Sequence, residues 1–141
     1  MTEADPSIIE SSVEKTHIWL EELAQELGGD RRYAYRALRA VLHALRDRVP
    51  VDVAAKLAAQ LPTLLRGVYY EDWVPSRTPL PIRDVDGFLA LVADEGHLAG
   101  ETEASVAVSA VLRVLRSHVS EGEIDEVTAV LPDELKALIA A

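Results

Sequence analysis

The chain has 141 residues, of which 49% are hydrophobic and none is cysteine, so it can build one compact core but no disulfide framework, zinc–thiolate site or thiol chemistry. Its net charge of −10 opposes nucleic-acid binding, and no apolar run approaches the roughly 18 residues of a membrane span. Residues 1–14 hold four acids and no basic residue, unlike a secretory signal peptide, so we expect a cytoplasmic protein.

The first predicted helix covers about residues 8–27. Ser7 and Glu10 fit a capping box at its start, and Gly28 and Gly29 are suited to end it. Between them, side chains recur at three- and four-residue steps along one helical face. This face comprises Ile9, Val13, Thr16, Leu20, Leu23 and Leu27. We expect it to lie in the core, with Trp19 beside it.

A second helix is expected after Asp30, a suitable N-cap residue, and before Pro50. Its apolar stripe comprises Ala34, Ala37, Leu38, Val41, Leu42, Leu45 and Val49. The opposite side forms a basic stripe of Arg32, Arg36, Arg39 and His43. Two shorter helices should follow, one over about 51–60 and one from Pro62 to near Gly67.

Residues 67–83 interrupt the helical pattern. They contain three prolines and three large aromatics, Tyr69, Tyr70 and Trp73. Because proline opposes a regular helix, we predict an ordered linker packed by its aromatics. Such aromatics outside helices can anchor a partner, so they are the candidate partner-binding residues; the alternative is that they seal the joint between two halves of the chain.

The second half of the chain repeats the first at an offset of 70 residues. Residues 34–49 recur in residues 104–119, and Leu61, Pro62 and Leu65 recur as Leu131, Pro132 and Leu135. Phe88 echoes Trp19 at an offset of 69, and both are expected in the core. The second half should form helices over about 102–118 and 121–130, then one from Pro132, with Ser120 and Glu123 as a capping box.

The predicted helix over 102–118 is apolar around more of its circumference than its counterpart. The counterparts of Arg36 and Arg39 are Val106 and Ser109. A helix with that pattern is usually more deeply buried. We therefore expect it at the centre of the fold or beneath a self-association surface.

No set of residues assembles a recognisable catalytic, cofactor or metal site. Glu14 and His17 resemble half of a di-iron motif, but such sites need two such motifs and further glutamates. His43 and Asp47 lie one turn apart and could pair, yet no nucleophile sits at a readable spacing. The basic stripe could contact phosphates, but nearby acids and the net charge favour a solvated face.

Several long phrases in the chain resemble a bacterial family known as domain of unknown function 2267. They include ALRAVLHALRDR, AAQLP, LLRGVYYEDW and FLALV, and the likeness covers about residues 7–141. Asp72 stands where the family pattern leads us to expect glycine. The resemblance implies a compact, all-helical, cytoplasmic bacterial protein with two related halves, and it brings no catalytic residues.

We predict an all-α fold in which residues 1–141 form one compact helical bundle domain. Two pseudo-symmetric four-helix repeats, residues 8–66 and 84–141, are joined by the linker 67–83. We expect a non-enzymatic module for protein interaction or regulation, with neither nucleic acid nor membrane as partner. The alternatives are a structural homo-oligomer, favoured by the uneven charge of the halves, and a helical bundle that binds a small ligand or metal.

Overall fold

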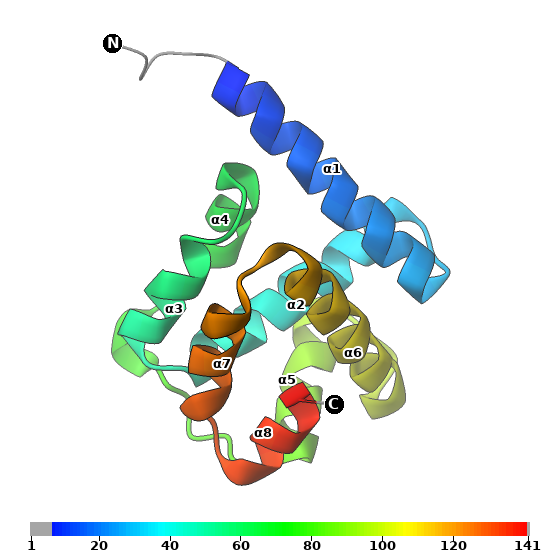
Figure 1. Cartoon of the computed structure of the whole chain (residues 1–141). Coiled ribbons are helices and arrows are strands. Elements are labelled where there is room, and N and C mark those ends of the chain that lie inside the picture. Colours follow the sequence, from blue (N-terminus) through cyan, green and yellow to red (C-terminus); the bar gives the residue numbers. More distant parts are fainter. Residues whose placement is uncertain (1–6, 141) are drawn as a thin grey trace.

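The computed structural model describes residues 7–140, which form eight α-helices and one short 3₁₀ helix without any β-strand (Figure 1). In chain order they are α1 (Ser7–Leu27), α2 (Arg31–Arg48), α3 (Val51–Ala58), α4 (Thr63–Tyr70), η1 (Pro75–Arg77), α5 (Val85–Gly96), α6 (Glu101–His118), α7 (Glu121–Ala129) and α8 (Asp133–Ala140). The predicted all-α class is confirmed. None of these helices is long and apolar enough to cross a membrane.

Local sequence signals set several helix ends. The Asp30 carboxylate accepts a hydrogen bond of 2.8 Å from the Tyr33 N–H, as expected of an N-cap residue. Asp84 caps α5 in the same way, at 2.8 Å from the Gly87 N–H. After α1, Gly28 has a φ of 71°, a left-handed conformation that glycine adopts without steric cost.

The predicted capping box of α7 forms only in part. The Ser120 hydroxyl accepts from the Glu123 N–H at 3.3 Å. The reciprocal bond is made by another residue, because Gln60 Oε1 accepts the Ser120 N–H at 3.2 Å. A side chain from the first half of the chain thus completes a helix start in the second half.

The centre of the fold is α2, which packs against α1, α3, α4, α5 and α6. The expectation that residues 102–118 occupy the centre is therefore wrong. One side of α6 faces solvent, where Val106 is 53% exposed, whereas α2 buries even His43, Arg46 and Arg48. The share of apolar residues around a helix did not predict its burial here, because the polar side chains of α2 are buried together with their hydrogen-bonding partners.

The core confirms the aromatic pair and corrects the face predicted for the first helix. Trp19 and Phe88 are 3% and 1% exposed. Leu20 and Leu23 are buried as expected, but Ile9 and Val13 are exposed. In Figure 1 the first turns of α1 project beyond the other helices, which leave Ile9 and Val13 uncovered in the part of the chain that the structure describes.

The segment between the two halves starts later than predicted. Residues 67–70 continue α4 to Tyr70 instead of belonging to the linker 67–83. The first proline of the segment is Pro75, where η1 begins. Since proline restricts only itself and the residue before it, it leaves the end of α4 free to remain helical.

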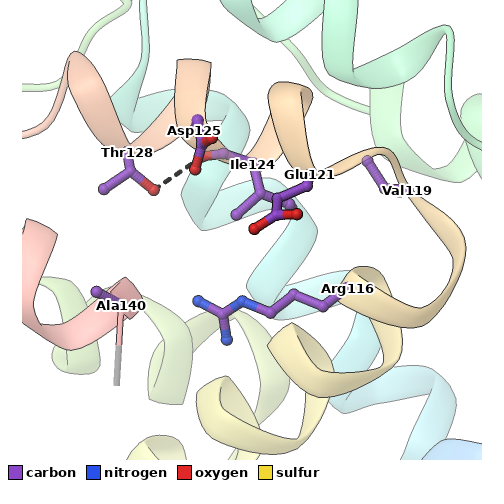
Figure 2. A pocket seen from close by; sticks show the side chains of 7 residues that line it. All are labelled: Arg116, Val119, Glu121, Ile124, Asp125, Thr128 and Ala140. Atoms are coloured by element: carbon purple, nitrogen blue, oxygen red, sulfur yellow. Dashed lines mark hydrogen bonds between the residues drawn. The ribbon is translucent and has the colours of Figure 1, made fainter.

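The second half surrounds a pocket of about 440 Å³ between α6, α7 and α8 (Figure 2). Its lining residues are Arg116, Val119, Glu121, Ile124, Asp125, Thr128 and Ala140.

Candidate functional site

Tyr69 is part of the core and is fully buried. Its phenol donates a hydrogen bond of 2.8 Å to the Ala54 carbonyl on α3. Burial raises the pKa of the phenol, because the charged form would lose its hydration. A partner would reach Tyr69 only after α4 had moved, so in this conformation the side chain holds α4 to α3.

Tyr70 and Trp73 are half-buried and stack on one another. Their ring centroids lie 5.2 Å apart with an interplanar angle of 29°, and both pack against the core. The indole N–H of Trp73 is buried without an acceptor among the described residues. These contacts favour the interpretation in which the aromatics seal a joint, while their exposed edges remain candidates for a partner.

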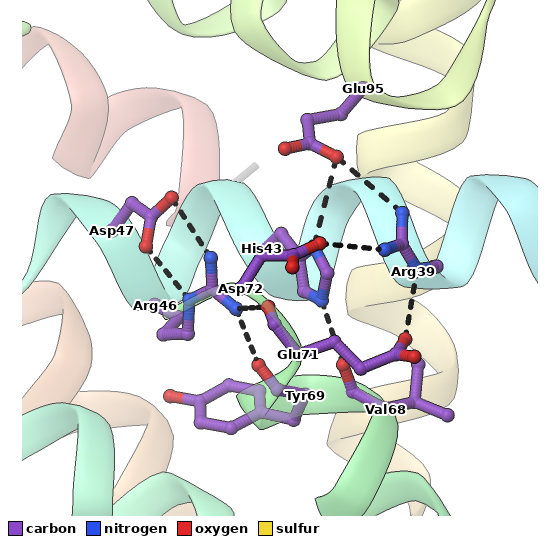
Figure 3. A network of polar contacts seen from close by, with 9 residues as sticks. All are labelled: Arg39, His43, Arg46, Asp47, Val68, Tyr69, Glu71, Asp72 and Glu95. Atoms are coloured by element: carbon purple, nitrogen blue, oxygen red, sulfur yellow. Dashed lines mark hydrogen bonds and ion pairs between the residues drawn. The ribbon is translucent and has the colours of Figure 1, made fainter. Parts of the chain in front are cut away.

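The predicted basic stripe does not form a free basic surface, because acids neutralise its centre. Arg39 lies 3.1 Å from Glu71, 3.6 Å from Asp72 and 3.6 Å from Glu95 (Figure 3). Arg32 and Arg36 are exposed. Carboxylates from the segment after α4 and from α5 therefore neutralise the centre of the stripe and leave its other end exposed.

His43 is buried instead of extending the stripe, with 1% of its surface exposed. Its Nε2 lies 2.7 Å from the Val68 carbonyl oxygen and therefore carries a proton. Its Nδ1 lies 3.7 Å from Glu95. Burial lowers the pKa of the imidazole, an effect that the Val68 carbonyl and Glu95 oppose. The predicted pair of His43 with Asp47 is wrong, because Asp47 binds Arg46.

Arg46, which the sequence did not single out as a site, is the centre of this network. Its side chain is 2% exposed. The guanidinium donates to both Asp47 carboxylate oxygens, at 2.7 and 3.0 Å. It also donates to the carbonyls of Tyr69 and Glu71, at 2.8 and 2.6 Å. Arg46 thus satisfies carbonyls at the end of α4, as backbone groups at helix ends require.

The aromatic segment and the basic stripe, predicted as separate sites, meet in this one network. Figure 3 shows α2 side chains directed at the end of α4 and at Glu95 of α5. Nearly every polar group drawn there has a partner within the chain. We interpret the network as a structural joint between α2, α4 and α5.

Among the described residues, the motif of Glu14 and His17 has no further metal ligands. His17 Nδ1 lies 3.1 Å from Arg31 Nη1. Within residues 7–140, no group of three or more histidine, cysteine, aspartate or glutamate side chains is placed to hold a metal ion.

The two most exposed large apolar side chains, Ile8 and Ile9, lie at the start of α1. Ile8 and Ile9 are 65% and 66% exposed, Val13 is 40% exposed, and Leu64 of α4 is 46% exposed. The start of α4 lies against this part of α1, because the Leu64 backbone N–H donates to the Ser12 hydroxyl at 2.6 Å. We call Ile8, Ile9, Val13 and Leu64 the α1 apolar surface. Grouped exposure of this kind marks interaction sites more often than single exposed residues do.

Two exposed acids border the apolar residues at the beginning of α1. Glu10 follows Ile9, Glu14 follows Val13, and both glutamates are exposed. One shallow depression is lined by these four residues and His17. The structure gives neither glutamate an ion-pair partner among the described residues. The surface is therefore apolar with an acidic margin.

A sequence signal for this surface existed in the internal repeat. At the offset of 69, the first residue of α5, Val85, corresponds to Thr16. Residues 7–15 of α1, which we call the α1 extension, have no counterpart in α5. The helices that the two halves share are therefore not expected to cover the α1 extension.

Comparison with known proteins gives one family. The model of the family described as "Uncharacterized conserved protein (DUF2267)" matches residues 16–138. The match thus begins after the α1 extension and includes the network around Arg46. No curated protein matches the chain.

Proposed function

The chain belongs to the uncharacterised family DUF2267, and we propose that it is a non-enzymatic interaction module that docks a protein partner on the α1 apolar surface. The observation that carries the proposal is the exposure of Ile8, Ile9 and Val13 on a part of α1 that projects from the fold (Figure 1). Ile9 and Val13 lie four residues apart and so share one side of the helix. This spacing suits recognition of a helix in a groove.

The charge of this surface specifies the kind of partner. Glu10 and Glu14 border the apolar residues, and the whole chain carries a net charge of −10. A second copy would bring like charges together, which costs free energy. We therefore propose a partner with an amphipathic surface in which lysines or arginines flank apolar side chains.

Self-association through α6 is the second candidate. Val106 is 53% exposed on α6, and the halves differ in charge: residues 17–67 carry eight basic and six acidic residues, and residues 84–141 carry three and twelve. Attraction between the first half of one molecule and the second half of another would support a homo-oligomer.

We also propose that the two halves are pseudo-symmetric four-helix repeats in one domain. Two contacts join residues that are 70 positions apart, as expected near an internal two-fold axis: Tyr33 donates to Glu103 at 2.6 Å, and Lys56 donates to Glu126 at 2.9 Å. Arg46 and Arg116, which correspond, each donate to a carbonyl at the same repeat position, Tyr69 and Ile139. The absence of cysteine is compatible with our proposal of a bacterial cytoplasmic location.

The proposal is tested with a fluorescent amphipathic peptide of leucines and lysines, titrated in an anisotropy measurement. We expect the double variant Ile9→Ser, Val13→Ser to bind at least tenfold more weakly than the unchanged protein, with the same melting temperature because both side chains are exposed. The matched control is Ile18→Ser. Ile18 is 49% exposed on the opposite side of α1 from Ile9, so its replacement should leave binding unchanged.

Two outcomes would contradict the proposal. Equal binding by the double variant and Ile18→Ser would show that the peptide binds through the net charge of the protein alone. Sedimentation equilibrium that gives a dimer, abolished by Val106→Ser but not by the double variant, would favour the homo-oligomer. A peptide with glutamates in place of lysines serves as the charge control and should not bind.

A further inference from the structure

The pocket between α6, α7 and α8 holds charges of both signs that the structure leaves unpaired with one another. Arg116 of α6 and Glu121 and Asp125 of α7 line it together. None of them forms an ion pair within the described part of the chain. Figure 2 shows the Arg116 guanidinium reaching between Glu121 on α7 and Ala140 on α8. Opposite charges that share a pocket without contact leave room for a ligand between them.

The corresponding arginine in the first half shows what the pocket lacks. Arg46 is buried and is neutralised by the next residue, Asp47. The residue after Arg116 is Ser117, whose hydroxyl donates to the Arg113 carbonyl instead. Among the described residues, Arg116 donates a hydrogen bond to the Ile139 carbonyl. Since a guanidinium has five N–H donors, Arg116 retains donors for a carboxylate.

The remaining lining gives the pocket an apolar wall. Val119 and Ile124 are largely buried but contribute to the lining. The Thr128 hydroxyl is occupied, because it donates to the Ile124 carbonyl at 2.8 Å. The volume of about 440 Å³ lies within the roughly 300–1,000 Å³ of small-molecule sites.

We infer that this pocket binds a free α-amino acid with an aliphatic side chain. Its carboxylate would bind the Arg116 guanidinium, which matches carboxylates in geometry and charge. Its ammonium group would face Glu121 and Asp125, and its side chain would pack on Val119 and Ile124. A simple anion is disfavoured by the two carboxylates, and a simple cation is disfavoured by Arg116.

The test uses three probes that share the leucine side chain and differ in which of their ends is charged, titrated into ¹⁵N-labelled protein and followed by NMR. L-Leucine carries both charges, N-acetyl-leucine only the carboxylate, and leucinamide only the ammonium group. We expect leucine to shift amide signals of residues 116–128 in a saturable manner. Both derivatives should bind at least tenfold more weakly, because each loses one charge-assisted contact.

Variants assign the two charged ends of the site. Arg116→Gln should abolish leucine binding, and the double variant Glu121→Gln, Asp125→Asn should weaken it at least tenfold. The control is Arg113→Gln, one turn earlier on α6, whose side chain pairs with Glu26 outside the pocket. If Arg116→Gln unfolds, the double variant still tests the inference, since neither of its residues makes an ion pair among the described residues. Equal shifts with all three probes, or none with leucine, would overturn it.

Discussion

Glu123 occupies the repeat position that Val53 has in the first half. Its side chain is buried on α7, with 7% exposed, and its Oε1 has no hydrogen-bond partner within the described residues. Burial raises the pKa of this carboxyl, and the neighbouring Glu126 acts in the same direction. Gln60 makes the bond to Ser120 that a capping box would give to Glu123. The carboxylate is therefore a local cost to folding.

Replacing this residue with its counterpart should stabilise the protein. We expect Glu123→Val to raise the free energy of unfolding by about 1–3 kcal/mol at pH 7, the usual penalty of a buried unsatisfied polar group. Urea denaturation measures the difference. Glu126→Val on the same helix is the control and should give no gain, because Glu126 is exposed and paired with Lys56. A loss of stability in Glu123→Val would show that the carboxylate has an important partner.

The same carboxyl should give the stabilisation a pH dependence of known sign. Its pKa is raised in the folded protein, so the folded state binds the proton more tightly than the unfolded state does. The penalty is complete above the folded pKa and disappears as the pH falls below the unfolded value. Urea denaturation from pH 7 to pH 4 should show the advantage of Glu123→Val shrinking. A constant advantage would contradict an ionised Glu123 at neutral pH.

His43 should act in the opposite direction. Its pKa is lowered by burial from the usual 6.5, so the folded state favours the neutral ring. The stability that depends on this ring is present above pH 6.5 and is lost as the pH falls through the lowered pKa. We expect His43→Gln, whose amide can still donate to Val68, to lose less stability between pH 7.5 and pH 5.5 than the unchanged protein. Parallel losses would exclude His43 as the titrating group.

At the scale of single elements, the position of α2 gives a clear order of protection. α2 is surrounded by five other helices, whereas α6 presents Val106 and Arg113 to solvent. Hydrogen exchange followed by mass spectrometry should therefore be slower in α2 than in α6. Exchange in the α1 extension should be faster than in residues 16–27 of the same helix, because few tertiary contacts protect it. Uniform protection along α1 would show that something covers the extension.

The segment after α4 should behave as a structural element. Trp73 packs on Tyr70 and on the core, so we expect Trp73→Ala to lower the free energy of unfolding by about 2–3 kcal/mol, somewhat less than for a fully buried tryptophan. Urea denaturation measures the change, with Val74→Ala as an exposed neighbour for control. An unchanged free energy of unfolding in Trp73→Ala would contradict this structural role and favour Trp73 as a residue that binds a partner.

At the scale of the whole molecule, sequence reasoning located the helices but not all the surfaces that cover them. Hydrophobic periodicity and N-cap residues such as Asp30 depend on residues close in sequence, so helices and their ends can be predicted from them. Periodicity groups Ile9 and Val13 with Leu20 on one face, but it does not show where the covering element ends. The network around Arg46 was missed because two of its acceptors are backbone carbonyls some 25 positions away, and every residue has such a carbonyl, so the sequence does not distinguish these two.

The shared core makes a prediction about the two halves. α2 packs on α5 and α6, and α1 packs on α6, so each half buries its apolar side chains largely against the other. A fragment of residues 1–78 or 79–141 would expose that interface to water, at roughly 25 cal/mol per Å² of apolar surface. We expect neither fragment alone to show a cooperative urea transition by circular dichroism. An equimolar mixture should recover helical signal, because the complementary surfaces are then both present. A cooperative transition in either fragment would mean that one repeat has a sufficient core of its own, and that the joint between repeats contributes little to folding.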